Sequence, residues 1–594
     1  MQLKKLATIA ASLACAGLIM AACSSSTNSA SGSGSGATTS VKSGGSLTYA
    51  LDENIPGWNI NTSADNEYVL QEVMNLIWPQ TFLINPQLQP YLNTDLVTSA
   101  TQTKSNPQTI VYKINPAAKW SDGQPINAED FFYNYAAQSG ATKSDGKTPL
   151  YTDIDGTPFD DASNTGYSQV KSVTNSAPAS GSCQSATITG IGSIPCANGD
   201  TVTVVFASPF ADWRSLFGNL VPAHKAATVG WNKGFVDYKN VVSGSWYKIS
   251  NYVENQYVVL KKNPSYWGTP GKLDTITFQI FNGDTQAVPA MQNGEVQVIN
   301  PIETSLSIVQ AADQLTGVTK SLIGGLEFQH IDFNESDPYL ALKSVRQAIA
   351  YGTDRNQIVA RTVGEFDPSL KPLENRMLVP SQAGYQDNGA AYATLDVAKA
   401  KSLLQSAGLT MSSDGYFQPA TGPQKGQDLT FTIKSTSGND LRASIEQLFQ
   451  ADMKNIGIKI NIANETASTL FGTDLPQGQY QMTLFAWVAT PFISGNLSIY
   501  CSYTNTSACG QNWTHYSNPQ VDSLLTAGAA ASSSTTEVSD FNKADQILWS
   551  DMDTLPLFQA PVFTVWSNKY GNIVPNPASV GITWNAQEWG VKAS

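Results

Sequence analysis

Charged side chains are scarce in this 594-residue chain, and basic ones are scarcer than acidic ones. Only 14% of the residues are charged, with 34 Lys and Arg against 47 Asp and Glu, so the formal net charge is -13. An average soluble domain has ~25% charged residues. Because phosphate binding relies on Lys and Arg, this balance excludes a nucleic-acid-binding surface. The composition also excludes a disordered chain and a polytopic membrane protein, and the length corresponds to about four domains of ~150 residues.

Histidine is rarer still, and the usual catalytic motifs are missing. The three histidines, His224, His330 and His515, form no His-x-x-x-His or His-Glu pair, so zinc hydrolysis has no support and no metal site is predicted. The sequence contains neither a Gly-x-Ser-x-Gly elbow nor a phosphate-binding P-loop. We therefore expect a protein that is not an enzyme and that needs no cofactor.

The first 44 residues predict export and anchoring. Lys4 and Lys5 precede an apolar run over residues 6–20, which at ~15 residues is shorter than the ~20 of a membrane span. Residues 19–23 read IMAAC and resemble a lipobox, in which Cys23 carries the lipid (palmitate) and becomes the mature N-terminus. The alternative is an ordinary cleaved signal peptide, residues 1–22, followed by a chance cysteine. Residues 23–44, mostly Ser, Gly, Thr, Ala and Asn, predict a flexible tether.

Four further cysteines favour an oxidising compartment. Cys183 and Cys196 are 13 residues apart, and Cys501 and Cys509 are 8 apart. Three connectivities are possible, and pairing each cysteine with its neighbour is the simplest. Export and lipidation together predict a protein attached to the cell membrane on its extracytoplasmic face.

Alternating strand and helix patterns indicate an α/β fold. Strands are predicted at 47–51, 109–114 and 201–206, and Asn127 is a good N-cap for a helix. A strand at 429–433, a helical apolar face over 441–453 and a second strand at 458–462 form a β-α-β unit. Such a unit favours a parallel strand pair covered by the helix. Another amphipathic helix is predicted at 395–408.

Five segments in order resemble the peptide/nickel-type extracellular solute-binding proteins of ABC importers, also called family 5. Over roughly residues 45–590, the matching segments are AKWSDGQPINAED (118–130), GSWYK (244–248) with NPSYWG (263–268), VRQAIAY (345–351) with Asp354-Arg355, residues 398–408, and IGI (456–458). The resemblance implies a two-lobed periplasmic-binding-protein type II (cluster C) fold with an extra subdomain inserted in lobe one. We expect lobe one at 45–300 plus 560–594, the inserted subdomain at about 75–205, and lobe two at 300–560.

The resemblance also implies where a ligand binds. The loop after the first strand, with Asn54 and Trp58, and a late segment, with Trp487 and Thr490, are the expected ligand-binding residues. In peptide-binding members the late segment reads roughly G-W-x-x-D, and its Asp pairs with the α-amino group of the ligand. Thr490 stands where that Asp would be, and a buried ammonium without a carboxylate costs several kcal/mol. This makes a free-amino peptide a less secure prediction for the ligand.

The expected function is therefore capture of a solute in an interlobe cleft. The expected ligand is an oligopeptide or a related amphiphilic solute, and the expected partners are ABC permease subunits with their ATPases. The protein itself is expected to be a lipid-anchored monomer that delivers the solute to them. The alternative is a solute-binding fold reused as an envelope regulator or sensor without a transport role.

Overall fold

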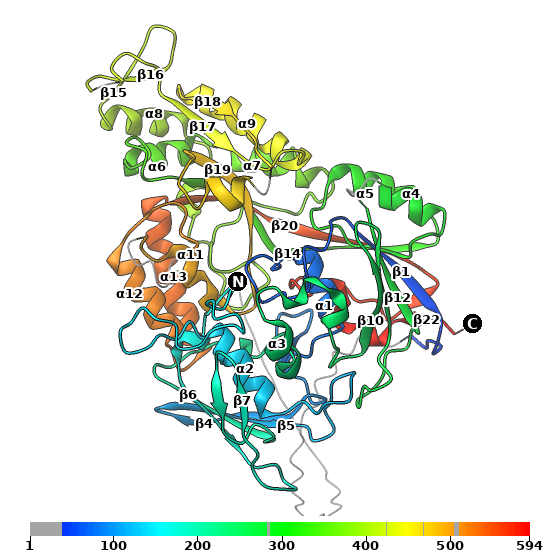
Figure 1. Ribbon diagram of the computed structural model, residues 1–594. Helices are drawn as coiled ribbons and strands as arrows, with labels where there is room; N and C mark the ends of the chain where they lie inside the picture. The colour runs from blue at the N-terminus through cyan, green and yellow to red at the C-terminus, as the bar shows by residue number, and fades with distance from the viewer. Residues whose placement is uncertain (1–38, 282–285, 423, 467–468, 504–509, 594) are drawn as a thin grey trace, which may run out of the picture. The chain divides into compact units, whose positions relative to one another are not determined.

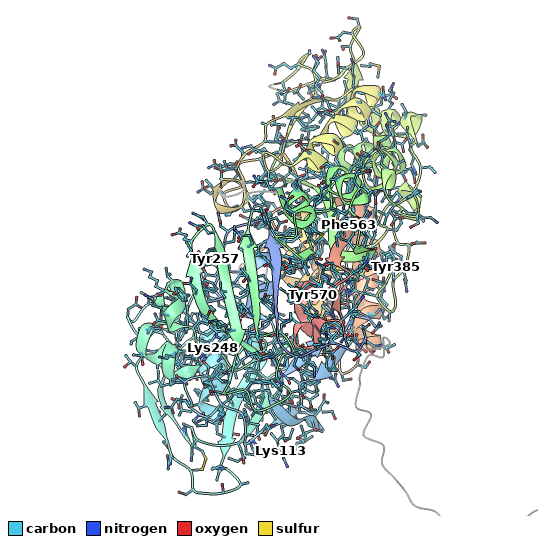
Figure 2. All side chains as sticks on the ribbon, turned by 90° about the vertical axis from the view of Figure 1, so that its right-hand side faces the viewer. Lys113, Lys248, Tyr257, Tyr385, Phe563 and Tyr570 are labelled. Atoms are coloured by element: carbon cyan, nitrogen blue, oxygen red, sulfur yellow. A yellow bond between two sulfur atoms is a disulfide. The ribbon has the colours of Figure 1, made fainter. Side chains whose placement is uncertain are left out.

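One continuous ten-stranded sheet runs through the folded body (Figure 1). The computed structural model describes residues 39–281, 286–422, 424–466, 469–503 and 510–593. The sheet has the order β10-β11-β12-β1-β13-β20-β14-β19-β17-β18. In Figure 2, Lys248 and Tyr257 mark β10 and β11 near one edge, and Phe563 marks β20 in the middle. In sheet order, the strands are β10 Tyr247–Val253, β11 Tyr257–Lys262, β12 Thr275–Ile280, β1 Ser46–Leu51, β13 Val298–Ile299, β20 Thr554–Ser567, β14 Val318–Phe333, β19 Met482–Val488, β17 Thr430–Lys434 and β18 Lys459–Ile462.

The two long strands β14 and β20 belong to both lobes. They pair antiparallel from Val318 opposite Ser567 to Asp332 opposite Thr554, and the register shifts between Gly324 and Phe328. Gly325 lies at this interruption, where an added Cβ would come within 2.9 Å of the Ala560 carbonyl oxygen. Glycine is therefore the residue that lets the strands approach closely here. We call residues 39–323 with 562–593 lobe one, and residues 328–557 lobe two.

Lobe one buries one large core and carries a second, inserted sheet. The core contains Trp58, Trp120 and Trp231, all at most 1% exposed. Asn127 caps the helix α2 as predicted, and its side chain and that of Asp130 form a capping box. The inserted sheet has the order β4-β5-β9-β6. The remaining elements here are β4 Val97–Ser105, β5 Gln108–Ile114, β6 Val170–Ser176, β9 Thr201–Phe206, the hairpins β2 Phe82–Ile84 with β3 Pro90–Leu92, β7 Ala186–Ile188 with β8 Gly192–Ile194 and β21 Tyr570–Gly571 with β22 Gly590–Val591, and the helices α1 Tyr68–Met74, α2 Ala128–Gln138, α3 Ala223–Val229, α4 Ala287–Gln292 and α5 Leu306–Asp313.

Lobe two covers the opposite end of the sheet with two groups of helices. The predicted β-α-β unit is confirmed: β17 and β18 are parallel, α9 Asp440–Ile456 packs against them, and Gly457 ends the helix with a φ of +86°. In Figure 1, α6, α8 and α9 gather around these strands, and α12 and α13 form a second group. The other elements are α6 Lys343–Gly352, α7 Arg355–Ala360, α8 Val397–Ser406, β15 Leu409–Met411, β16 Phe417–Pro419, α11 Leu497–Tyr500, α12 Pro519–Ala529 and α13 Ser534–Asp551.

Two expected boundaries differ from the structure. Lobe one continues past residue 300, because Ile308 and Ala312 of α5 pack in one cluster with Ala50 and Val565. The chain passes into lobe two only near Gly324, where the Gly324-Gly325 pair interrupts the strand pairing without ending β14. The predicted tether also ends earlier than residue 44, because the Lys42 amide donates to the Val591 carbonyl and Gly44 donates to Lys272.

The structure describes three of the five cysteines for which a disulfide or a lipid was predicted. Cys183 and Cys196 form a disulfide, as predicted, with their Cα atoms 4.4 Å apart. Cys501 is also disulfide-bonded, while its expected partner Cys509 and the expected lipid site Cys23 lie outside the described residues. Within the described ranges, no helix is both long and apolar enough to cross a membrane.

Candidate ligand-binding cleft

A cleft lies where β14 and β20 pass between the lobes. It is partly open to solvent. Both lobes and the crossing strands contribute to it, so a ligand here would contact each of them. The residues that line it are Tyr68, Pro301, Ile302, Leu326, Glu327, Val488, Ala560, Pro561, Val562, Pro577 and Ser579.

Glu327 brings a carboxyl group to this mostly apolar lining. It lies on β14 directly opposite Val488 of β19. Burial, followed by the negative charge of Glu303, raises the pKa of Glu327 to about 8, although the charge of Arg442 opposes this shift. A group with such a pKa is mostly protonated at pH 7 and ionises readily once a cation approaches.

The guanidinium of Arg442, which lies near Glu327, forms an ion pair with Glu303. Arg442 of α9 donates through Nη2 to Glu303, which follows β13, and through Nη1 to Thr436 Oγ1 at 2.8 Å. Its Nε contacts Gln329 Oε1 at 3.3 Å. The Asn439 side chain also donates to Glu303. The loop after β13 is thereby joined to the start of α9, and the positive charge of Arg442 is held on Glu303 rather than on Glu327.

A second buried carboxyl lies behind Tyr68. Glu72 of α1 is 1% exposed and accepts hydrogen bonds from Tyr49 Oη at 2.6 Å and Asn300 Nδ2 at 3.1 Å. Burial raises the pKa of Glu72 well above its usual range, and the charges of Glu72 and Glu327 help burial to raise that of Tyr68. The electrostatics of this wall of the cleft are therefore acidic.

Trp487 and Thr490 flank the cleft-lining residue Val488 in the chain, but neither is among the residues that line the cleft. The half-buried Trp487 ring stacks on His330, with centroids 5.8 Å apart, and on Trp513 at 5.2 Å. Thr490 is exposed, and its hydroxyl donates to the Phe492 carbonyl at 2.7 Å and accepts from the Phe492 amide at 3.1 Å. The Thr490 hydroxyl therefore closes a local turn instead of facing a ligand.

The loop after the first strand, which carries Asn54 and Trp58, does not line the cleft as expected. Trp58 is 1% exposed and packs edge-on against Tyr252, with centroids 5.0 Å apart, inside the lobe-one core. Asn54 is exposed, and neither residue is among those that line the cleft. The loop still reaches the cleft through Asp52, whose carboxylate accepts from the amide of the lining residue Ile302 at 2.8 Å. Sequence reasoning missed Glu327, which lies inside β14 two residues after the Gly324-Gly325 pair.

The histidines occupy structural positions. His224 Nε2 lies 2.8 Å from Asp122, and His515 contacts Ser336. His330 is fully buried between Phe485 and Trp487, with Nε2 3.3 Å from Asp332. Across the described ranges, no group of three His, Cys, Asp or Glu side chains is arranged to hold a metal ion.

A two-lobed α/β body with a cleft at strands shared by both lobes defines the class of the solute-binding proteins. The model of the bacterial extracellular solute-binding proteins, family 5 (middle), matches residues 92–508 of this chain. Because the match covers more than half of the chain, the protein belongs to this family. The family and the relatives below are binding proteins.

Individual relatives support this assignment. The oligopeptide-binding protein OppA of Mycobacterium tuberculosis (strain ATCC 25618 / H37Rv) is 29% identical over 534 residues, which is 88% of this chain and 81% of that protein. The probable monoacyl phosphatidylinositol tetramannoside-binding protein LpqW of the same strain is 23% identical over 446 residues, 70% of this chain and 64% of that protein.

Solved structures show the same fold. The periplasmic EDTA-binding protein EppA superimposes with a TM-score of 0.81 at 25% identity, covering 94% of this chain and 98% of that one. The oligopeptide-binding protein AppA from Bacillus subtilis, in complex with a nonapeptide, superimposes with a TM-score of 0.74 at 18% identity, covering 93% and 100%.

Proposed function

We propose that this protein is the substrate-binding component of an ABC importer for oligopeptides or a related amphiphilic solute. The observation that carries the proposal is the identity to an oligopeptide-binding protein along 88% of the chain, together with a cleft lined from both lobes. The apolar lining and the aromatic face of Trp487 suit a ligand with apolar side chains of varied sequence. Asn54 and Thr490 are kept as neighbours of the site rather than as direct contacts, whereas Trp58 belongs to the lobe-one core.

The rest of the proposal concerns delivery. The protein is a monomer, anchored through lipidated Cys23 on the extracytoplasmic face of the cell membrane, and it closes its lobes around the ligand. The closed form then docks on the permease subunits and their ATPases. Closure follows from contacts that the ligand makes with both lobes at once, since only differential contacts shift such an equilibrium.

Native mass spectrometry of the purified protein tests the ligand class. We expect a co-purified peptide, exchangeable for members of a synthetic pentapeptide mixture, and compaction in small-angle scattering when peptide is added. A protein that captures no peptide from the mixture, or that binds without compaction, contradicts the proposal.

A second candidate is binding without a transport role, as an envelope regulator or sensor. The 23% identity to a protein named as a probable binder of a monoacyl phosphatidylinositol tetramannoside supports a glycolipid ligand for this candidate. It predicts a co-purified acylated glycolipid in place of a peptide. A gene beside two permease genes and two ATPase genes favours import, whereas a gene among those of cell-wall synthesis favours regulation.

A further inference from the structure

The cleft offers a ligand one carboxyl group that is not engaged within the protein. Glu327 lines the cleft, and within the described part of the chain its carboxyl has no hydrogen-bond partner. By contrast, the Glu72 carboxyl accepts two hydrogen bonds and Glu303 is paired with Arg442. Buried or half-buried carboxyl groups normally have partners, so Glu327 is suited to a partner that arrives with the ligand.

The charges around Glu327 favour a cation rather than an anion. The groups that act on it are Asp52, Glu53 and Glu303, with Arg442 opposing them. Because Arg442 is held by Glu303, Thr436 and Gln329, its positive charge is largely balanced within the protein. A positively charged ligand group placed here would gain from each of these carboxylates.

The position of Glu327 matches a role that Thr490 does not fill. The family resemblance places a carboxylate at residue 490, two residues beyond Val488 on the same chain segment. Here the Thr490 hydroxyl is engaged with the backbone of Phe492. Glu327 stands opposite Val488 on the neighbouring strand, so a carboxyl group is available at the same end of β19, but from β14.

We propose that Glu327 is the counter-ion for an ammonium group of the ligand, taking the role of the aspartate that is replaced at Thr490. This inference rests on the proposed peptide-binding function and deepens it by assigning the recognition of a cation to one residue. The ammonium comes either from a peptide amino terminus or from a lysine side chain. Both sources present the same chemistry, an N–H donor with a full positive charge.

A capture experiment with defined peptide mixtures tests the role of Glu327. The full-length protein is incubated with three pentapeptide mixtures: free amino termini without lysine, acetylated amino termini without lysine, and acetylated amino termini with one lysine. Bound peptides are quantified by native mass spectrometry. We expect the wild-type protein to retain the free-amino or the lysine mixture at least tenfold more than the acetylated, lysine-free mixture, and the preferred mixture identifies the source of the ammonium.

Substitutions then assign the preference to one side chain. Glu327→Gln keeps the size of the side chain and should abolish the tenfold preference, while Glu254→Gln, in the exposed turn between β10 and β11, should retain it. Adding Thr490→Asp to Glu327→Gln should restore the preference, because Asp can accept the same Phe492 amide and supplies the carboxylate. Matching thermal unfolding curves of the variants show that folding is unchanged.

The possible outcomes distinguish a failure of the Glu327 inference from a failure of the proposed peptide-binding function. A Glu327→Gln variant that still prefers ammonium-bearing peptides as strongly as wild type overturns the inference and leaves peptide binding intact. Equal capture of all three mixtures by the wild-type protein has the same meaning. Failure of the wild-type protein to capture any mixture overturns peptide binding itself, and the inference with it.

Discussion

Lobe closure should take up a proton at the carboxyl pair formed by Asp212 and Glu537. Asp212 follows β9 in lobe one, and Glu537 lies in the first turn of α13 in lobe two. Ser494 joins them, since its amide donates to Asp212 Oδ2 at 2.9 Å and its hydroxyl to Glu537 Oε1 at 2.5 Å. The Ala211 amide also donates to the Ala529 carbonyl at 3.2 Å. This contact is therefore one of those that hold the lobes together.

The pKa values set the sign of the effect. Burial and the charge of Asp212 raise the pKa of Glu537 to about 9, and burial also raises that of Asp212, which the positive charge of Arg214 opposes. A glutamate in water ionises near 4.3. Because the pKa is raised in the joined form, the joined form is favoured at low pH and loses this advantage as pH rises through about 9. The window is thus about pH 4.5 to 9.

The magnitude follows from one proton taken up on closure. One proton per closure event changes the closing equilibrium up to ~10-fold per pH unit within the window, which is about 1.4 kcal/mol per unit. Between pH 6 and pH 8 the apparent affinity for a captured peptide should therefore fall by up to ~100-fold through this pair.

Titration calorimetry on wild type and Glu537→Gln measures the contribution of Glu537 to the pH dependence of peptide affinity. The variant removes the titrating group and keeps the hydrogen bond to Ser494, so its affinity should lack the Glu537 contribution to the pH dependence. Both proteins contain Glu327, whose pairing with an ammonium would release a proton and act with the opposite sign, so the difference between them isolates Glu537. Asp540→Asn, which breaks a pair with Lys543 on the same helix, is the matched control and should behave as wild type. Identical pH slopes for wild type and Glu537→Gln would refute the reasoning.

Three further perturbations distinguish site residues from scaffold. Trp487→Ala should weaken peptide binding about tenfold, whereas Trp58→Ala should cost ~3–5 kcal/mol of stability, since Trp58 is packed in the core; equal peptide affinity of Trp487→Ala and wild type contradicts the first part. Arg376→Met should cost ~3–5 kcal/mol in chemical unfolding, because Arg376 is fully buried between Asp545 and Asp553, and Lys543→Met at a surface pair should cost under ~1 kcal/mol. Replacing Cys183 and Cys196 by Ser should make residues 177–200 sensitive to protease at temperatures where the wild type resists, at a cost of ~2–4 kcal/mol; an unchanged cleavage pattern argues against a structural role.

Regular elements were predictable where side-chain periodicity and end signals agree. The alternation of Leu429, Phe431 and Ile433, the apolar face of α9 and the stop at Gly457 each have a local cause, so the unit could be located from sequence. The capping box of Asn127 and Asp130 is a second example. The lobe boundary was harder to locate, because β14 passes from one lobe to the other without ending and is marked there only by the Gly324-Gly325 pair.

The site was harder to predict because its members meet through strand pairing. Both Trp58 and Trp487 are aromatic residues next to a loop, yet packing beside Tyr252 buries the first in the lobe-one core and stacking on His330 leaves the second half-buried in lobe two. Their sequence contexts do not distinguish them. The distinction comes from which face of a strand or loop meets a hydrophobic core, and that depends on the partner elements.

The counter-ion shows how a missing motif residue and a structural register complement one another. From sequence, Thr490 indicates only that a carboxylate is absent from its expected place. The pairing of Glu327 with Val488 adds that a carboxyl group stands one strand away, in the same cleft. Strands in one sheet are separated by ~4.8 Å, a distance that a Glu side chain and a flexible ligand terminus can span between them. A family member could therefore move its counter-ion between strands without changing what it recognises, and a search for the carboxylate should follow the sheet register rather than the motif.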